Sequence, residues 1–86
     1  MSIRSVTSIS VDRQGEVVRL CHDGADWSPI AVADAVMDME LGIHSYCVNW
    51  PEGTTQITDA MDGDLKYLRT NRDGTARNSL LDLPRR

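Results

Sequence analysis

Two cysteines and two histidines of this 86-residue chain are the residue types that could together form a Cys₂His₂ zinc site. Cys21 and His22 are adjacent, whereas His44 and Cys47 lie three positions apart. Four such ligands form a zinc site when they converge on one point. Both pairs fall in strand-like segments, where residues one or three positions apart point to opposite faces of a sheet. We therefore predict no metal and no cofactor, with buried, unbridged thiols and surface histidines.

Catalytic combinations are no better supported by the sequence. No serine stands in a Gly-x-Ser-x-Gly elbow, and strand geometry separates His44 from Cys47, a thiol and imidazole pair that could otherwise form a nucleophile. Asp62 and Asp64 flank a glycine, where aspartate is favoured because it forms turns. The glycines are scattered at turns and form no phosphate-binding loop. The sequence predicts a protein that is not an enzyme.

Charge is distributed unevenly along the chain, although the formal net charge is only -4. Residues 20–65 contain nine acidic residues and no lysine or arginine, whereas residues 66–86 contain six basic residues and two acidic ones. One interpretation is that this basic tail attracts the acidic middle of the same chain, for example through Asp59 and Lys66. Exposed pairs of that kind add only about 0 to 1 kcal/mol each.

The second interpretation is that the tail binds phosphate, nucleic acid or an acidic partner. We predict its binding residues to be Arg69, Arg72, Arg77 and Tyr67, with Arg85 and Arg86 extending the basic segment. Turn geometry at residues 72–74 would bring Arg69 and Arg77 together. The acidic overall balance and the few aromatic residues disfavour nucleic acid as the ligand.

The first half of the chain predicts a hairpin followed by one helix. Residues 3–11 and 16–22 alternate as strands around a glycine turn, with Ile9 expected opposite Val18. Ser28 is the expected N-cap of a helix from Pro29 to about Leu41, and Trp27 is expected to contact Val32 as a hydrophobic staple. Gly42 is expected to end this helix in a left-handed conformation.

The second half predicts three further strands and a short tail. The strands are expected over residues 43–50, 54–61 and 65–70. Asp62-Gly63 is expected as a two-residue hairpin turn, placing Asp59 opposite Lys66. Leu80, Leu81 and Leu83 precede a proline, which favours a short turn or 3₁₀ segment.

These elements predict one α+β domain over residues 1–86. We expect two layers, in which one helix packs on one face of an antiparallel sheet of four to five strands, in the order ββαβββ. The chain is too short for two domains, and its 41% hydrophobic and 26% charged residues are typical of a globular protein. Neither a signal peptide nor a membrane span is predicted, so we expect a cytoplasmic, bacterial protein.

The tail also carries a family resemblance. Tyr67-Leu68-Arg69-Thr70, then Asp73-Gly74-Thr75, then a segment from Asn78 to Leu-Leu-Asp-Leu-Pro84, resembles a family of small bacterial proteins of unknown function, domain-of-unknown-function family 3892. Ser79 departs from the pattern, because it separates Asn78 from the leucines. The resemblance covers about half of the chain and implies no activity, cofactor or catalytic residue.

The sequence predicts a complete small fold but no combination of catalytic residues. It therefore favours a non-catalytic module that binds another protein or associates with itself. Nucleic acid or phosphate binding by the basic tail is the alternative. If Met39 and Leu41 are exposed while Ile30, Ala33, Val36 and Met37 pack inward, a small apolar patch is left for a partner.

Overall fold

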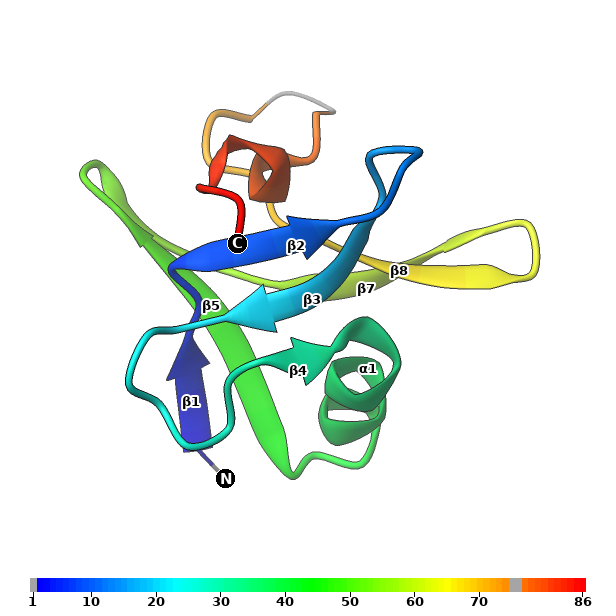
Figure 1. Cartoon of the computed structure of the whole chain (residues 1–86), viewed down its shortest axis with the longest axis horizontal. Helices are drawn as coiled ribbons and strands as arrows, with labels where there is room; N and C mark the ends of the chain where they lie inside the picture. The colour runs from blue at the N-terminus through cyan, green and yellow to red at the C-terminus, as the bar shows by residue number, and fades with distance from the viewer. Residues whose placement is uncertain (1, 75–76) are drawn as a thin grey trace.

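The computed structural model describes residues 2–74 and 77–86 and has one α-helix among short strands (Figure 1). In chain order the elements are β1 (Ser2–Ser5), β2 (Ser8–Val11), β3 (Val17–Cys21), β4 (Ile30–Ala31), α1 (Val32–Glu40), β5 (His44–Trp50), β6 (Gly53–Gln56), β7 (Thr58–Asp62), β8 (Leu65–Arg69) and the 3₁₀ helix η1 (Ser79–Asp82). The fold class is therefore α+β. No helix of the described residues is long and apolar enough to cross a membrane.

The strands form three small sheets, so the prediction of one antiparallel sheet with four to five strands is wrong. The sheets have the orders β1-β5-β6, β2-β3-β4 and β7-β8, and β1 pairs with β5 in parallel. The expected long strands over residues 3–11 and 54–61 each break once, near Val6 and at Ile57. Because both residues are buried at the breaks, with 1% and 0% exposure, the core fixes the points where the chain changes partner.

The N-terminal hairpin forms in a different register from the predicted one. Ile9 pairs with Leu20, not with Val18, and a bulge follows between Ser10 and Val11. The turn sets this register, because the Asp12 carboxylate accepts hydrogen bonds from the backbone N–H groups of residues 14 and 16.

The second hairpin is displaced by one residue from its prediction. Asp62 pairs with Leu65, so the two loop residues are Gly63 and Asp64, and Gly63 has the positive φ of 63° that a type II′ turn requires. Lys66 therefore lies opposite Met61, and its ammonium binds Glu40 of α1 instead of Asp59.

The helix begins three residues later than predicted, at Val32. The two residues before it form β4 against β3, which satisfies backbone groups that a helix would have used. Ser28 does not cap the helix, because its hydroxyl accepts from the backbone N–H of His22 at 2.8 Å, and Ala31 stands at the cap without a side-chain bond. The end is as predicted, since Gly42 has a φ of 70° and a Schellman pattern closes the helix.

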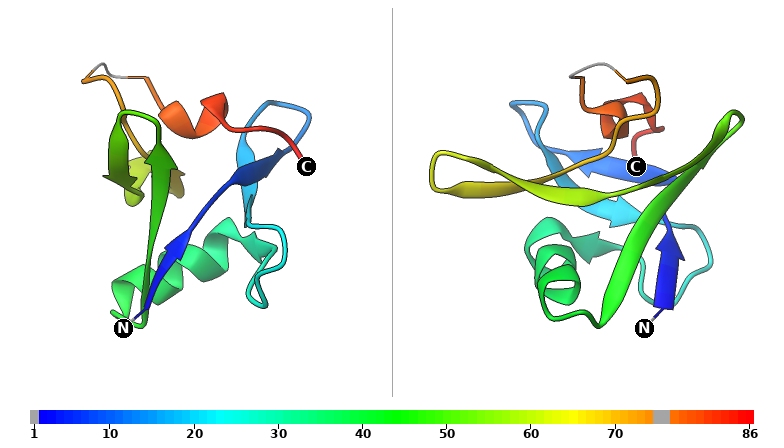
Figure 2. Two further views of the ribbon diagram at one scale, coloured as in Figure 1. Left: turned by 90° about the vertical axis from the view of Figure 1, so that its left-hand side faces the viewer. Right: turned by 180° about the vertical axis from the view of Figure 1, so that it is seen from behind.

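The tail, predicted as a short turn or 3₁₀ segment, forms the 3₁₀ helix η1, and the chain after it returns to β2. Ile9 donates to the carbonyl of Pro84 at 2.9 Å, and its own carbonyl accepts from the N–H of Arg86 at 2.8 Å. Figure 2 shows α1 and η1 at opposite ends of the molecule, with the strands between them. Eleven buried side chains form the core: Val6, Ile9, Leu20, Ala35, Val36, Tyr46, Val48, Ile57, Leu68, Leu80 and Leu83.

Candidate functional site

Arg72, one of the predicted binding residues, is held against the protein itself. Its guanidinium carbon lies 4.1 Å from the centroid of the Trp50 ring, and its Nε donates to Glu52 at 2.6 Å. A second contact, of 3.7 Å, joins its Nη1 to Asp82. A stacked guanidinium between two carboxylates is typical of a structural arginine. The interpretation in which the tail attracts the acidic middle applies to this residue, because Glu52 belongs to that middle.

Arg77 is also engaged by acidic side chains. Its two terminal nitrogens donate to the two oxygens of Asp82 at 2.6 and 3.0 Å, and Nη2 also contacts Asp73 at 3.2 Å. The hydrogen bonds to Asp82 and then to Asp73 raise the pKa of Arg77. Asp82 thereby joins Arg72 to Arg77. The predicted meeting of Arg69 and Arg77 stays a prediction; Arg69 is half-buried at the end of β8, opposite Thr58.

The last two arginines bind groups of the same chain. Arg85 donates to the backbone carbonyls of residues 81 and 83 at 2.9 and 2.8 Å, and Arg86 forms an ion pair with Asp23. Lys66 is similarly paired with Glu40, and this hydrogen bond raises the pKa of the lysine. Arg86 and Lys66 therefore have their counter-charges within the fold, whereas Arg85 is bound by neutral backbone carbonyls.

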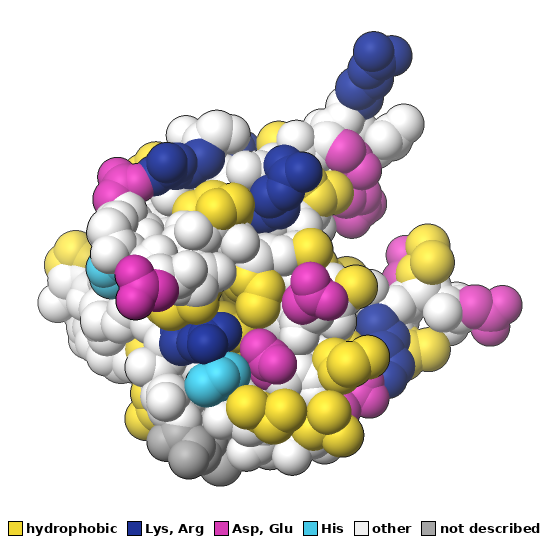
Figure 3. Space-filling view, turned by 60° about the horizontal axis from the view of Figure 1, so that its bottom comes forward, with side chains coloured by type: hydrophobic (Ala, Val, Ile, Leu, Met, Phe, Trp, Pro, Cys, Tyr) yellow, Lys and Arg dark blue, Asp and Glu magenta, His cyan; other side chains and the backbone are white. Residues whose placement is uncertain are grey.

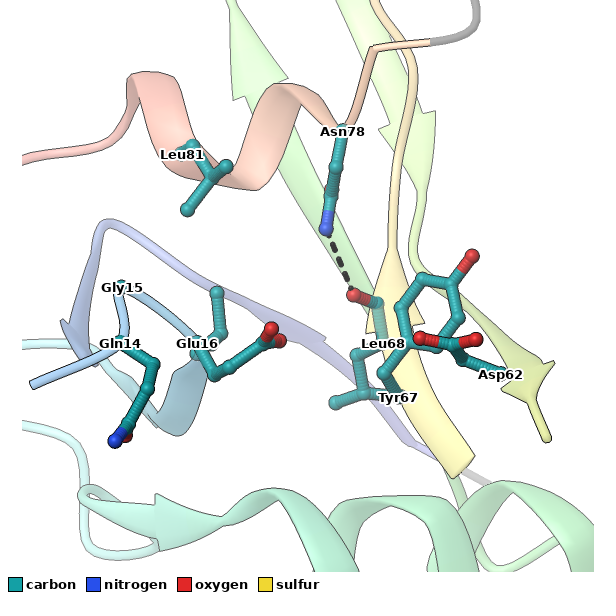
Figure 4. Close-up of a pocket in the computed structure, with 9 residues that line it drawn as sticks. Gln14, Gly15, Glu16, Asp62, Tyr67, Leu68, Asn78 and Leu81 are labelled. Carbon is teal, nitrogen blue, oxygen red and sulfur yellow. Dashed lines mark hydrogen bonds between the residues drawn. The ribbon is translucent and has the colours of Figure 1, made fainter. Parts of the chain in front are cut away.

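Tyr67 borders a hollow of about 380 Å³ between β8, η1 and the turn before β3. Neither Arg72 nor Arg77 lines this hollow. Glu16 and Asp62 lie on opposite sides of this hollow, with Tyr67 beside Asp62 (Figure 4). Asn78 closes one wall by donating to the backbone carbonyl of Leu68 at 3.0 Å. Both carboxylates are exposed, and the hollow between them is open to water.

A polar cluster that the sequence did not reveal joins β1, β5 and α1. The Tyr46 hydroxyl accepts from Arg4 and donates to Asp38, both at 2.8 Å, and the Arg4 guanidinium lies 5.5 Å from the Trp27 ring centroid. Burial, and then the hydrogen bond to Asp38, raise the pKa of Tyr46 to about 12. The tyrosine is fully buried and held in its neutral form, which suits an anchor and not a general base.

The histidines and cysteines are used in structural contacts. Arg4 can only donate to Nε2 of His44, at 3.0 Å, so neutral His44 carries its proton on Nδ1, which is buried without a partner. Nδ1 of His22 contacts the carbonyl of Ser5 at 2.7 Å. Cys21 and Cys47 are free and buried, as predicted. Within the described residues, no three side chains of the metal-binding types are grouped to hold an ion.

The outer face of α1 is the largest departure from the predicted burial pattern. Met39 packs against the core, whereas Met37 is 60% exposed, the reverse of the predicted arrangement. Leu41 is 66% exposed. We call Ala33, Met37 and Leu41 the α1 stripe, because residues four positions apart form one ridge along a helix. The late start of the helix explains the reversal, since β4 positions α1 so that Ala35 and Val36 face the core.

Two hollows adjoin the α1 stripe. One of about 310 Å³ is bordered by the stripe with Val36 and Glu40, and one of about 390 Å³ lies between Ala33, Val36 and Lys66. Figure 3 shows hydrophobic side chains gathered over this face, with acidic side chains beside them. Ile43 and Met61 are also exposed, at 46% and 58%. A face of this kind is suited to contact another molecule.

Comparison with known proteins gives no relative: no family model, no curated protein and no solved structure matches this chain. The resemblance of the tail to domain-of-unknown-function family 3892 stays a prediction.

Proposed function

We propose that this protein is a non-catalytic protein-interaction module whose contact surface is the α1 stripe. The exposure of Met37 and Leu41, two large apolar side chains on one helical ridge, carries the proposal. Covering such side chains contributes about 25 cal/mol for each Å² removed from water. The hollows on either side of Ala33 offer places for apolar side chains of a partner.

A non-catalytic role is supported by what the reactive groups do. Cys21 and Cys47 are buried, and their sulfur atoms lie 4.0 and 3.9 Å from serine hydroxyls. Tyr46 is held neutral inside the Arg4 and Asp38 cluster. Two free, buried thiols are typical of a reducing compartment, so a cytoplasmic location, in a bacterium, is part of the proposal.

Binding of nucleic acid or phosphate through Arg69, Arg72, Arg77 and Tyr67 is the alternative function. A phosphate group would compete with Glu52 and Asp82 for the guanidinium of Arg72, and with Asp73 and Asp82 for that of Arg77. This competition places the alternative second.

Site-specific photo-crosslinking tests the proposed function. A photo-reactive amino acid replaces Leu41 in one variant and Ile3 in a matched control, because Ile3 is an apolar side chain that is 74% exposed on β1. We expect a discrete protein adduct from position 41, with another protein or with a second copy, and none from position 3. A monomer by light scattering that gives no adduct from position 41 would overturn the proposal.

A further inference from the structure

We infer that the partner of the α1 stripe is a cationic segment of another protein, which places apolar side chains on the stripe and lysine or arginine side chains beside it. The inference rests on the proposed function and names the chemistry of its partner. It follows from the acidic groups around the stripe.

Helix geometry places an acidic residue on each side of the stripe. With about 100° between successive residues, Asp34 lies beside Met37 on one side of the stripe, and Glu40 lies beside Met37 on the other side. Asp34 and Glu40 are both exposed. A partner that covers the stripe therefore meets a carboxylate at each border.

The acidic character is only partly compensated within the fold. Glu40 is paired with Lys66, but Asp34 has no salt bridge among the described residues. Asp59 is exposed and also lacks one there; it borders a hollow of about 280 Å³ with Met39 and Gly42, at the end of the helix. The last turn of α1 contains no basic residue, so the partial negative charge of its terminal carbonyls adds to that of the carboxylates.

These charges select among the possible occupants. A second copy that docked through its own stripe would bring its Asp34 and Glu40 to a surface that already carries the same two carboxylates, and each copy has a formal net charge of -4. Like charges facing each other at an interface disfavour that pairing. An anionic membrane surface is repelled for the same reason. A cationic segment with apolar side chains can cover the stripe and also pair with the carboxylates on either side of it.

Two synthetic peptides test the charge of the partner. The first is an amphipathic helix with leucine on one face and lysine on the other, and the second has glutamate in place of each lysine. Fluorescence anisotropy of the labelled peptides measures their binding to the whole protein. We expect the lysine peptide to bind at least about tenfold more tightly than its twin, with an affinity that falls as salt is added.

Matched variants locate the binding. Replacing both Met37 and Leu41 by serine should weaken the lysine peptide about tenfold, whereas Ile3→Ser, an equally exposed apolar change on β1, should not. Asp34→Asn should weaken it about threefold, whereas Asp26→Asn, which removes an exposed carboxylate before the helix, should not. Circular dichroism confirms that each variant is folded.

The outcomes separate this inference from the proposed function. Equal binding of both peptides, lost in the Met37 and Leu41 variant, would overturn the cationic partner but leave the stripe as a docking surface. Binding of the lysine peptide that no stripe variant weakens would show general charge attraction and overturn the inference. Failure of both peptides to bind would also overturn the inference, and so would binding of the protein to phosphatidylserine vesicles instead of the lysine peptide. The proposed function is decided separately, by the crosslinking result.

Discussion

The basic tail and the outer face of α1 use charge in opposite ways. In the tail, Arg72 and Arg77 meet Glu52, Asp73 and Asp82, so each guanidinium has its counter-charge inside the fold. On α1, exposed apolar side chains stand between Asp34 and Glu40; Glu40 is paired with Lys66, and within the described part of the chain Asp34 has no salt bridge. The basic tail is the more conspicuous feature in the sequence, but its charges are engaged in internal contacts. The exposed apolar surface lies instead on α1.

The strongest test of this comparison is whether the tail is a structural element. Leu80 is completely buried in η1, so Leu80→Ala should lower the free energy of unfolding by about 3 kcal/mol, through lost burial and the cavity left behind. The neighbouring Leu81 is 41% exposed, and Leu81→Ala should cost less than about 1 kcal/mol. Urea unfolding measures both. Equal losses would mean that η1 is not docked on the core.

Tyr46 of β5, which donates to Asp38 of α1, should make the stability of the protein depend on alkaline pH. The pKa of Tyr46 is raised from 10.0 to about 12, chiefly by burial, so the folded state holds the phenol proton more tightly than the unfolded state does. This contribution is complete below pH 10 and is lost as the pH rises through about 12. It amounts to about 2 to 3 kcal/mol.

Chemical denaturation at a series of pH values measures this loss, with Tyr46→Phe as the control. The variant should lack the Tyr46 share of the decline, although other groups still titrate in the same range. Absorbance of tyrosinate should show Tyr46 ionising only as the pH approaches about 12. Identical pH profiles for the variant and the parent protein would contradict the buried Arg4, Asp38 and Tyr46 cluster.

A smaller effect separates the two arginines of the tail. Arg72→Gln should lower the free energy of unfolding by about 1 kcal/mol, because it removes the stack on Trp50 together with the pair to Glu52. Arg77→Gln should cost less, since the Arg77 side chain is 52% exposed and its pairs are screened by water. Urea unfolding measures both variants, and tryptophan fluorescence in a Trp27→Phe background follows the surroundings of Trp50. Salt-sensitive binding of a single-stranded RNA that both variants abolish would instead favour the nucleic-acid alternative.

Local signals in the sequence predicted the parts of the fold that depend on a few adjacent residues. Gly42 ends the helix as expected, the tail forms its 3₁₀ turn, and a strand occupies residues 44–50. The breaks near Val6 and at Ile57 were missed, because each depends on which distant strand the chain meets next. The same limit applies to α1, whose exposed side is set by pairing of β4 with β3 and not by its own periodicity.

The candidate site was predicted in part for the same reason. Arginine spacing marks a basic segment, but it does not show that Glu52, twenty positions earlier, returns to Arg72. The cluster around Tyr46 was also out of reach, since Arg4 meets Asp38 only when β1 pairs with β5 in parallel. Apolar residues at helical spacing were the available signal for the α1 stripe. The sequence left Leu41 exposed but turned Met37 inward, because a helix extended to Pro29 adds Ile30 to the same ridge.

The smallest expected effect on stability is also the one that bears most on function. Replacing Met37 and Leu41 together by serine should change the free energy of unfolding by no more than about 0.5 kcal/mol, because both side chains are already largely in water. A comparable double change inside the core, such as Val36 with Leu68, should be strongly destabilising, since these two side chains are 6% and 1% exposed. Thermal and urea unfolding measure the pair of variants. A large loss of stability in the Met37 and Leu41 variant would mean that the stripe supports the fold. A neutral change combined with weaker binding of the lysine peptide would assign these side chains to partner binding, because the fold would then not depend on them.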